Sequence, residues 1–181
     1  MGAELTIVTG PSRGAKSRWA EHLAQQHGSK VLYVATGPAL PGDEDWQRRL
    51  GLHRSRRSAA WVTHEVGAEL PEFLLSAPKR HLLLIDSLGS WLAHHIELNH
   101  EAWELRQEAM LTAVGACAAP MVLVAEECGW GVVPATAVGG RFRDRLGRME
   151  QLLMARAGAA WLVLHGRAID LLACSVSVPE G

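Results

Sequence analysis

Cysteine is scarce in this sequence, and neither sign of charge predominates. Its 181 residues include three cysteines, too few and too scattered for a disulfide framework or a zinc knuckle, which is typical of a reducing compartment. Its 18 Lys and Arg against 19 Asp and Glu give a net charge of −1, so the composition does not indicate a polybasic surface. Apolar runs stay well below the roughly 18 residues of a membrane span. Because the first residues also lack a signal-peptide pattern, we expect a cytoplasmic protein with no membrane span and no nucleic acid partner.

What is present is the hydrophobic content of an ordinary globular protein. Hydrophobic residues make up 48% of the chain, enough for one domain of this length to bury its own core without a structural metal. No internal repeat, low-complexity stretch or linker interrupts the chain. We therefore expect residues 1–181 to form a single domain.

The most informative stretch is residues 9–17, TGPSRGAKS, which lies between an apolar run and an amphipathic segment. Gly10, Lys16 and Ser17 fit the P-loop pattern G-x-x-x-x-G-K-[ST], in which backbone N–H groups bind phosphate, the lysine reaches the β- and γ-phosphates and the hydroxyl binds Mg²⁺. One position departs from the pattern, since Ala15 stands at the second glycine. The alternative interpretation is a glycine-rich turn before a helix. The predicted phosphate-binding residues are Gly10, Pro11, Ser12, Arg13, Gly14, Ala15, Lys16 and Ser17.

Further apolar runs alternate with segments of helical period, the arrangement of an α/β protein. Short contiguous apolar runs favour buried parallel strands. We therefore expect a mostly parallel sheet with helices on both faces. The predicted strands are 5–8, 30–35, 81–86, 121–125 and 161–164, with an edge strand at 169–176. The predicted helices are 17–26, 69–76, 87–98, 101–117 and 138–157.

Polar residues follow several of these strands, at the edge where parallel sheets bind ligands. A breaker-rich loop, 36–45, follows the second strand, Asp86 ends the third, and Glu126 and Glu127 follow the fourth. In P-loop proteins a carboxylate at the end of a strand contributes to the Mg²⁺ shell. Asp86 and Ser17 are therefore the predicted Mg²⁺ ligands.

Positive charge concentrates within residues 44–57. A solvated helical face and an anion site both explain such a run. Its basic and imidazole side chains are Arg48, Arg49, His53, Arg54, Arg56 and Arg57. The histidines at 94, 95 and 100 lack the spacing of a metal-binding HExxH helix, so we interpret them as polar surface.

Several segments carry a more specific pattern when they are taken in order. They are 9–21 (compare TGGxxSGKSxxAE), 31–36 (V-x-Y-[IV]-A-T), 49–65 (R-I-x-x-H-R-x-x-R-P-x-x-W-x-T-x-E), 86–92 (D-C-L-T-x-W-L), 126–134 (N-E-V-G-x-G-I-V-P) and 141–144 (R-x-F-R-D). Together they resemble the bifunctional adenosylcobinamide kinase / adenosylcobinamide-phosphate guanylyltransferase family of cobalamin biosynthesis. The resemblance spans nearly the whole chain.

Members of that family phosphorylate adenosylcobinamide with a nucleoside triphosphate and then transfer GMP from GTP to that phosphate through a guanylylated histidine, giving adenosylcobinamide-GDP. The resemblance implies that His53 is this histidine and that Lys16 is catalytic. It also implies a RecA-like P-loop NTPase fold, Mg²⁺ as cofactor, GTP and ATP as substrates, and a homo-oligomer. The other nucleotide-binding residues that it implies are Thr36, Arg49, Arg54, Arg57, Glu65 and Asp86.

Some positions depart from the pattern of the family. Ala15 replaces a glycine, Glu126 and Glu150 stand where Asn is usual, and Ser87 and Gly89 replace Cys and Thr. Two alternatives follow. One is a P-loop kinase or NTPase for another small molecule, and the other is a degenerate nucleotide-binding protein whose kinase step is impaired.

Overall fold

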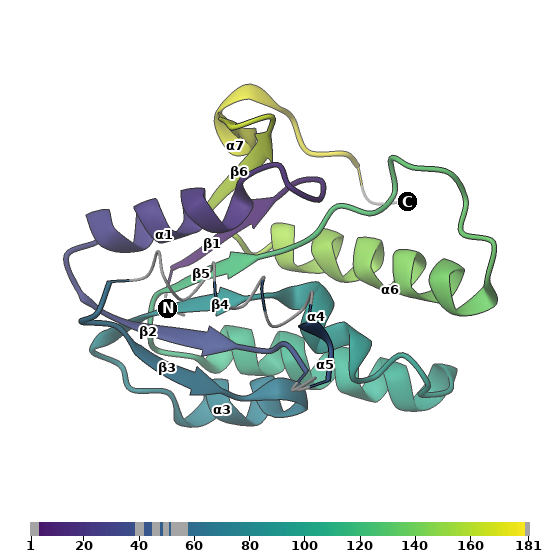
Figure 1. The fold of residues 1–181 in the computed structure, drawn as a ribbon, viewed down its shortest axis with the longest axis horizontal. Helices are drawn as coiled ribbons and strands as arrows, with labels where there is room; N and C mark the ends of the chain where they lie inside the picture. The colour runs from purple at the N-terminus through teal and green to yellow at the C-terminus, as the bar shows by residue number, and fades with distance from the viewer. Residues whose placement is uncertain (1–3, 39–41, 45–47, 49–50, 52–57, 180–181) are drawn as a thin grey trace.

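The computed structural model describes residues 4–38, 42–44, 48, 51 and 58–179. Within these residues, seven strands form one sheet of order β3-β2-β4-β5-β1-β6-β7 (Figure 1). The β6–β7 pair is antiparallel and the other pairs are parallel. The strands are β1 (Leu5–Thr9), β2 (Lys30–Ala35), β3 (Val62–Glu65), β4 (His81–Asp86), β5 (Met121–Val124), β6 (Ala159–Leu164) and β7 (Arg167–Asp170). The helices are α1 (Lys16–Gln26), η1 (Gly67–Glu69), α3 (Leu70–Ser76), α4 (Leu88–Ala93), α5 (His100–Ala116), α6 (Ala137–Met154) and α7 (Leu171–Cys174).

Two cores lie on opposite faces of the sheet. Successive side chains of a strand point to opposite faces, so Ile7 and Val8 of β1 belong to different clusters. Val8 packs in the cluster that contains Ala20 of α1, whereas Ile7 packs in the cluster that contains Trp91 of α4 and Met110 of α5. Because helices cover both faces, the central strands are apolar along their whole length, which is why they appear in the sequence as uninterrupted apolar runs.

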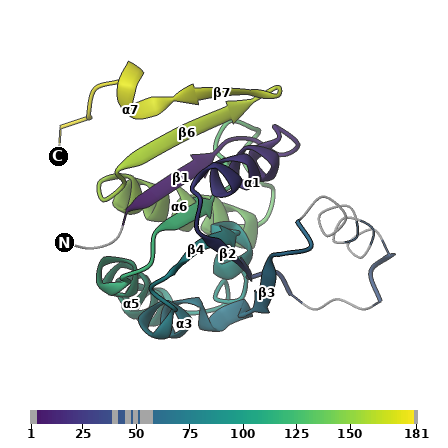
Figure 2. The same cartoon turned by 90° about the vertical axis from the view of Figure 1, so that its left-hand side faces the viewer.

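The strand order places the two ends of the sheet far apart. Figure 2 shows β7 and β6 at one end and β3 at the other, with β1 and β4 between them. The predicted α/β class, with a mostly parallel sheet and helices on both faces, is confirmed. Among the described helices, none combines the length and the apolar content that a membrane span requires.

The edge strand β3 was not predicted from the sequence. All four of its residues are exposed, so it has no apolar run, and its parallel pairing with β2 through Ala35 and Glu65 rests on backbone contacts. A hydrophobic pattern predicts a strand only where the strand buries a side chain.

Two predicted elements end earlier than expected. The predicted helix 87–98 begins after its N-cap, Ser87, and stops at Ala93, because the N–H groups that follow Ala93 bond to carbonyl oxygens three residues back and form turns. The predicted edge strand 169–176 is wrong beyond Asp170, where the carboxylate accepts the N–H of Ala173 and begins α7. Asp is a favoured N-cap residue, and this local signal overrides the apolar run.

Candidate functional site

The P-loop connects β1 directly to α1, as its pattern predicts. The N-cap of α1 is Ala15, whose side chain cannot accept the first N–H groups of the helix, and the first turn holds no acidic residue. A helix N-terminus of this kind presents N–H groups to an anion. Lys16 is buried, and its Nζ donates to the carbonyl oxygen of Pro11 at 2.9 Å, so the ammonium group lies across the loop. Phosphate oxygens are stronger acceptors for this ammonium than a carbonyl.

The displaced glycine of the loop has a geometric explanation. A Cβ on Gly14 would lie 2.6 Å from the carbonyl oxygen of Val163 in β6, and a Cβ on Gly10 would overlap the same oxygen. Both glycines therefore permit the loop to approach β6. Ala15 adopts left-handed backbone torsions, φ 84° and ψ 20°, in which a glycine has no steric penalty but an alanine does. Position 14 requires the absence of a side chain, whereas position 15 tolerates a methyl group at an energetic cost.

Carboxylates converge on the P-loop because β5 lies between β1 and β4 in the sheet. Glu126 and Glu127 follow the end of β5, and the carboxylate of Glu126 interacts electrostatically with both Asp86 and Lys16. The backbone N–H of Glu127 donates to the carbonyl oxygen of Gly10 at 2.9 Å, and the hydroxyl of Tyr33 donates to Oδ2 of Asp86 at 2.7 Å. The backbone N–H of Gly129 donates to the side chain of Glu127, which shapes the loop that follows.

Glu126 connects the end of β5 to the start of α4. Its Oε1 accepts a hydrogen bond from the hydroxyl of Ser87, and its Oε2 accepts the N–H of Gly89 at 2.8 Å. A Cβ on Gly89 would overlap Oε2, so this glycine makes room for the carboxylate. Burial raises the pKa of Glu126, partly offset by these two hydrogen bonds. Three positions that depart from the family pattern, Ser87, Gly89 and Glu126, thus form one hydrogen-bonded cluster.

Glu150 of α6 reaches the other side of the loop. Its Oε1 accepts the hydroxyl of Thr9 at 2.6 Å, where Thr9 is the last residue of β1. Burial raises its pKa to about 7, and the nearby carboxylate of Glu126 acts in the same direction, while the Thr9 hydrogen bond and Lys16 oppose the shift. The sequence offered a signal for this residue: Glu150 follows Leu146 by four positions and therefore lies on the apolar face of its helix.

Ser17 and Asp86, the predicted Mg²⁺ ligands, both carry side-chain oxygen atoms. Ser17 is half-buried in the first turn of α1, and Asp86 is half-buried at the end of β4. Mg²⁺ prefers oxygen ligands and is commonly held by one or two protein groups together with substrate phosphates. This donor set therefore fits Mg²⁺.

Two predicted nucleotide-binding residues lie away from the P-loop surface. Thr36 is fully buried, and its hydroxyl donates to the carbonyl oxygen of Ser87 at 2.6 Å and accepts the N–H of Ser87 at 2.7 Å, so it joins the ends of β2 and β4. Glu65 is exposed at the end of β3, with β2, β4 and β5 between it and β1. The basic residues Arg49, His53, Arg54 and Arg57 lie outside the described residues, so their placement remains a prediction.

Two polar side chains make contacts with backbone carbonyl groups that the sequence does not reveal. Arg145 is buried on α6, where its guanidinium donates to the carbonyl oxygens of His95, Ile96 and Leu98. It also lies 4.9 Å from the centre of a Trp103 ring. His94 is exposed, but its Nε2 is 2.9 Å from the carbonyl oxygen of Thr36. A helical period alone could not reveal these contacts, because each partner lies more than 40 positions away in the sequence.

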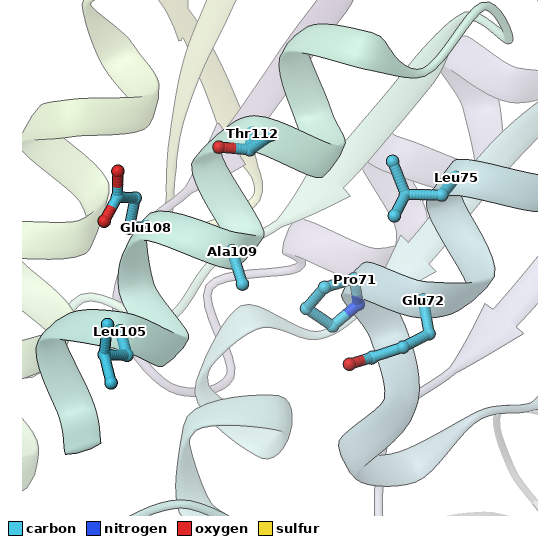
Figure 3. Close-up of a pocket in the computed structure, with 7 residues that line it drawn as sticks. All are labelled: Pro71, Glu72, Leu75, Leu105, Glu108, Ala109 and Thr112. Atoms are coloured by element: carbon cyan, nitrogen blue, oxygen red, sulfur yellow. The ribbon is translucent and has the colours of Figure 1, made fainter.

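Hollows on the surface of the described residues include two that differ in their relation to the site. One, of about 370 Å³, lies between α3 and α5 (Figure 3) and is lined by Pro71, Glu72, Leu75, Leu105, Glu108, Ala109 and Thr112, none of which belongs to the site described above. The other, of about 230 Å³, adjoins the P-loop at Ala15.

Comparisons with known proteins agree with the motifs. Residues 6–171 match the family described as cobinamide kinase / cobinamide phosphate guanyltransferase, CobU. The chain is 34% identical over 167 residues to the bifunctional adenosylcobalamin biosynthesis protein CobP of Pseudomonas aeruginosa, covering 91% of this chain and 95% of that protein. It is 32% identical over 182 residues to the bifunctional adenosylcobalamin biosynthesis protein CobU of Salmonella typhimurium, covering 92% and 99% respectively. A solved structure titled PH0250, from Pyrococcus horikoshii, shares the fold at 8% identity with a TM-score of 0.57, over 93% of this chain and 86% of its own.

Proposed function

The chain belongs to the cobinamide kinase / cobinamide phosphate guanyltransferase family of cobalamin biosynthesis, and from this premise we propose that its P-loop binds the nucleoside triphosphate used in both reactions. The observation that supports this proposal is the geometry of residues 10–17, which combine an uncapped helix N-terminus with the buried side chain of Lys16, whose ammonium group donates to the carbonyl oxygen of Pro11. Both features bind phosphate.

In the first reaction, the hydroxyl oxygen of cobinamide attacks the γ-phosphorus of ATP or GTP, and the bond to the β-phosphate oxygen breaks. Lys16 and the N–H groups of the loop stabilise the negative charge on the β- and γ-phosphates. Ser17 and Asp86 would hold Mg²⁺, which would neutralise charge on the phosphates. Tyr33 orients Asp86 by donating its hydroxyl to that carboxylate.

In the second reaction, the imidazole of His53 attacks the α-phosphorus of GTP, and pyrophosphate leaves. A phosphate oxygen of cobinamide phosphate then attacks the same phosphorus, the P–N bond breaks, and His53 is regenerated. A neutral imidazole is a competent nucleophile at pH 7. Arg49, Arg54 and Arg57 stabilise the charge on the transferring group. The support for this half is the sequence pattern of residues 49–65.

Incubation of the protein with α-labelled GTP and Mg²⁺ tests this assignment. We expect acid-labile label on the wild-type protein, no label on His53→Ala, and normal labelling of His100→Ala, which removes an exposed histidine at the start of α5. Lys16→Ala should lose both labelling and cobinamide phosphorylation.

Two outcomes would favour the alternatives. A protein that binds GTP, acquires no label and makes neither product would be a degenerate nucleotide-binding protein. Phosphorylation of some other acceptor, unaffected by His53→Ala, would favour a different P-loop kinase.

We also propose, from the family resemblance, a cytoplasmic homo-oligomer. Sedimentation equilibrium at several protein concentrations tests the assembly, and a monomer at every concentration would contradict it.

A further inference from the structure

The loop between β5 and α6 has no role in the reactions as described so far. This β5–α6 loop, residues 128–136, follows the two carboxylates at the end of β5, and Figure 1 shows it extending away from the sheet before α6 begins. Three of its apolar side chains lie in water: Trp130 is 62% exposed, Val132 94% and Val133 68%. Folded proteins seldom leave a group of large apolar side chains exposed unless the group binds something.

Hydrogen bonds hold the β5–α6 loop at both of its ends. At the first end, the carboxylate of Glu127 accepts the backbone N–H of Trp130 at 3.3 Å. At the other end, the hydroxyl of Thr136 caps α6 by accepting the N–H of Gly139 at 3.1 Å. A Cβ on Gly139 would lie 2.7 Å from the Cβ of Pro134, so Pro134 packs closely against the first turn of this helix. The exposed apolar side chains therefore belong to a loop whose two ends are fixed.

The β5–α6 loop begins beside the P-loop. The backbone N–H of Glu127 donates to the carbonyl oxygen of Gly10 at 2.9 Å. Trp130 follows Glu127 by three positions, so their Cα atoms lie within about 11 Å of one another. The loop also leaves the sheet at the carboxyl ends of its parallel strands, where proteins of this class bind their ligands. A molecule that reacts at the P-loop can therefore extend over this loop.

The lack of charge in this segment indicates the class of ligand. Residues 128–140 contain no charged side chain, although charged residues make up 20% of the whole chain. Such a surface offers nothing to the phosphates of the nucleotide. It suits the other substrate, cobinamide, because the corrin ring carries methyl groups and neutral amide side chains. The ring is also much larger than the arm that bears the reacting hydroxyl, so it needs a surface next to the phosphate site.

We propose that the β5–α6 loop is the binding surface for the corrin ring of cobinamide, with the side chains of Trp130, Val132 and Val133 packed against the ring. The inference rests on the proposed binding of the triphosphate by residues 10–17, because the hydroxyl of the bound cobinamide must reach the phosphate held there. These three side chains determine which acceptor binds, and they do not touch the reacting atoms.

Equilibrium dialysis of cobinamide, which absorbs visible light, tests this proposal directly. With a saturating non-hydrolysable GTP analogue and Mg²⁺ present, Val132→Ser should weaken the affinity for cobinamide by about tenfold, the loss expected when a valine is removed from an apolar contact. Trp130→Ser should weaken it by about tenfold or more. The affinity of both variants for the GTP analogue should stay within about twofold of that of the wild type. In steady-state assays of cobinamide phosphorylation, KM for cobinamide should rise while kcat changes little.

A matched control is available at the opposite edge of the sheet. Val62→Ser makes the same change at an exposed valine at the amino end of β3 and should alter the affinity for neither ligand.

Three outcomes would contradict the inference or its basis. Val132→Ser and Trp130→Ser variants that bind cobinamide as the wild type does would overturn the proposed surface. A change of mass of either variant in sedimentation equilibrium would also overturn it, because the loop would then be a contact between copies of the chain. Wild-type protein that binds cobinamide through this loop but does not bind the GTP analogue would instead remove the phosphate site at residues 10–17.

Discussion

At the residue scale, Ala15 and Gly14 have opposite steric requirements although they are neighbours. Ala15 is held in the left-handed region at φ 84°, which costs an L-residue about 1–2 kcal/mol, so Ala15→Gly should raise the free energy of unfolding by up to about 1 kcal/mol after the entropic cost of glycine. Gly14→Ala should lower it by about 1–3 kcal/mol, because the new Cβ would lie 2.6 Å from a carbonyl oxygen. Urea denaturation of both variants measures the difference, and changes of the same sign would contradict this reading.

Glu150 gives the protein a specific pH dependence. Burial raises its pKa from 4.5 to about 7, so the folded state retains this proton to a higher pH than the unfolded chain. Between those values unfolding releases the proton, and the stability contributed by this group therefore falls as the pH rises. Glu150→Gln, whose amide oxygen can still accept from Thr9, should stabilise the protein more at about pH 8 than at about pH 5.

Urea denaturation at both pH values checks this expectation. Glu108→Gln provides the control, since Glu108 is an exposed carboxylate on α5. An effect of Glu150→Gln that is the same at both pH values would show that Glu150 is ionised alike in the folded and unfolded states.

At the scale of elements, Glu126 joins β5 to the N-terminus of α4. Glu126→Ala leaves the N–H of Gly89 without its acceptor and should cost about 1–3 kcal/mol of unfolding free energy. Glu126→Gln should cost less, because its amide oxygen can accept from Gly89 while its amide nitrogen donates to the hydroxyl of Ser87. Thermal and urea unfolding of the two variants separates these outcomes. Equal losses for Ala and Gln would mean that the two hydrogen bonds contribute little.

Elements with a buried face could be predicted from the sequence, and elements without one could not. β2 and β4 have the predicted bounds because each is an apolar run covered on both faces. β3 was missed because all its residues are exposed, and the strand at 169–176 was extended too far because the capping role of Asp170 was overlooked. A hydrophobic pattern indicates which side chains are buried, whereas the pairing of an edge strand and the capping of a helix depend on hydrogen bonds to the backbone.

The same limit applies to the candidate site. The P-loop and Asp86 follow from spacing along the chain. The contacts of Glu126 with Gly89, and of Glu150 with Thr9, join residues 37 and 141 positions apart, and only the strand order brings them together. Local pattern therefore identifies the phosphate-binding loop, while tertiary structure identifies the carboxylates around it.

At the scale of the whole molecule, the two cores share one sheet. Neighbouring residues of β1 belong to clusters on opposite faces of the sheet. Both cores therefore depend on the same strands, and loss of either core would expose one face of them. We propose that residues 1–181 form a single domain that unfolds in one cooperative transition. Far-UV circular dichroism and tryptophan fluorescence should give coincident denaturation curves. Two separate midpoints would indicate units that unfold independently.

The most direct test of the account is a crystal structure with a non-hydrolysable GTP analogue and Mg²⁺. We expect the triphosphate within residues 10–17 and the Nζ of Lys16 moved from the carbonyl oxygen of Pro11 to the β- and γ-phosphates. A triphosphate bound elsewhere, with Lys16 still hydrogen-bonded to Pro11, would contradict the central claim that this loop is the nucleotide site.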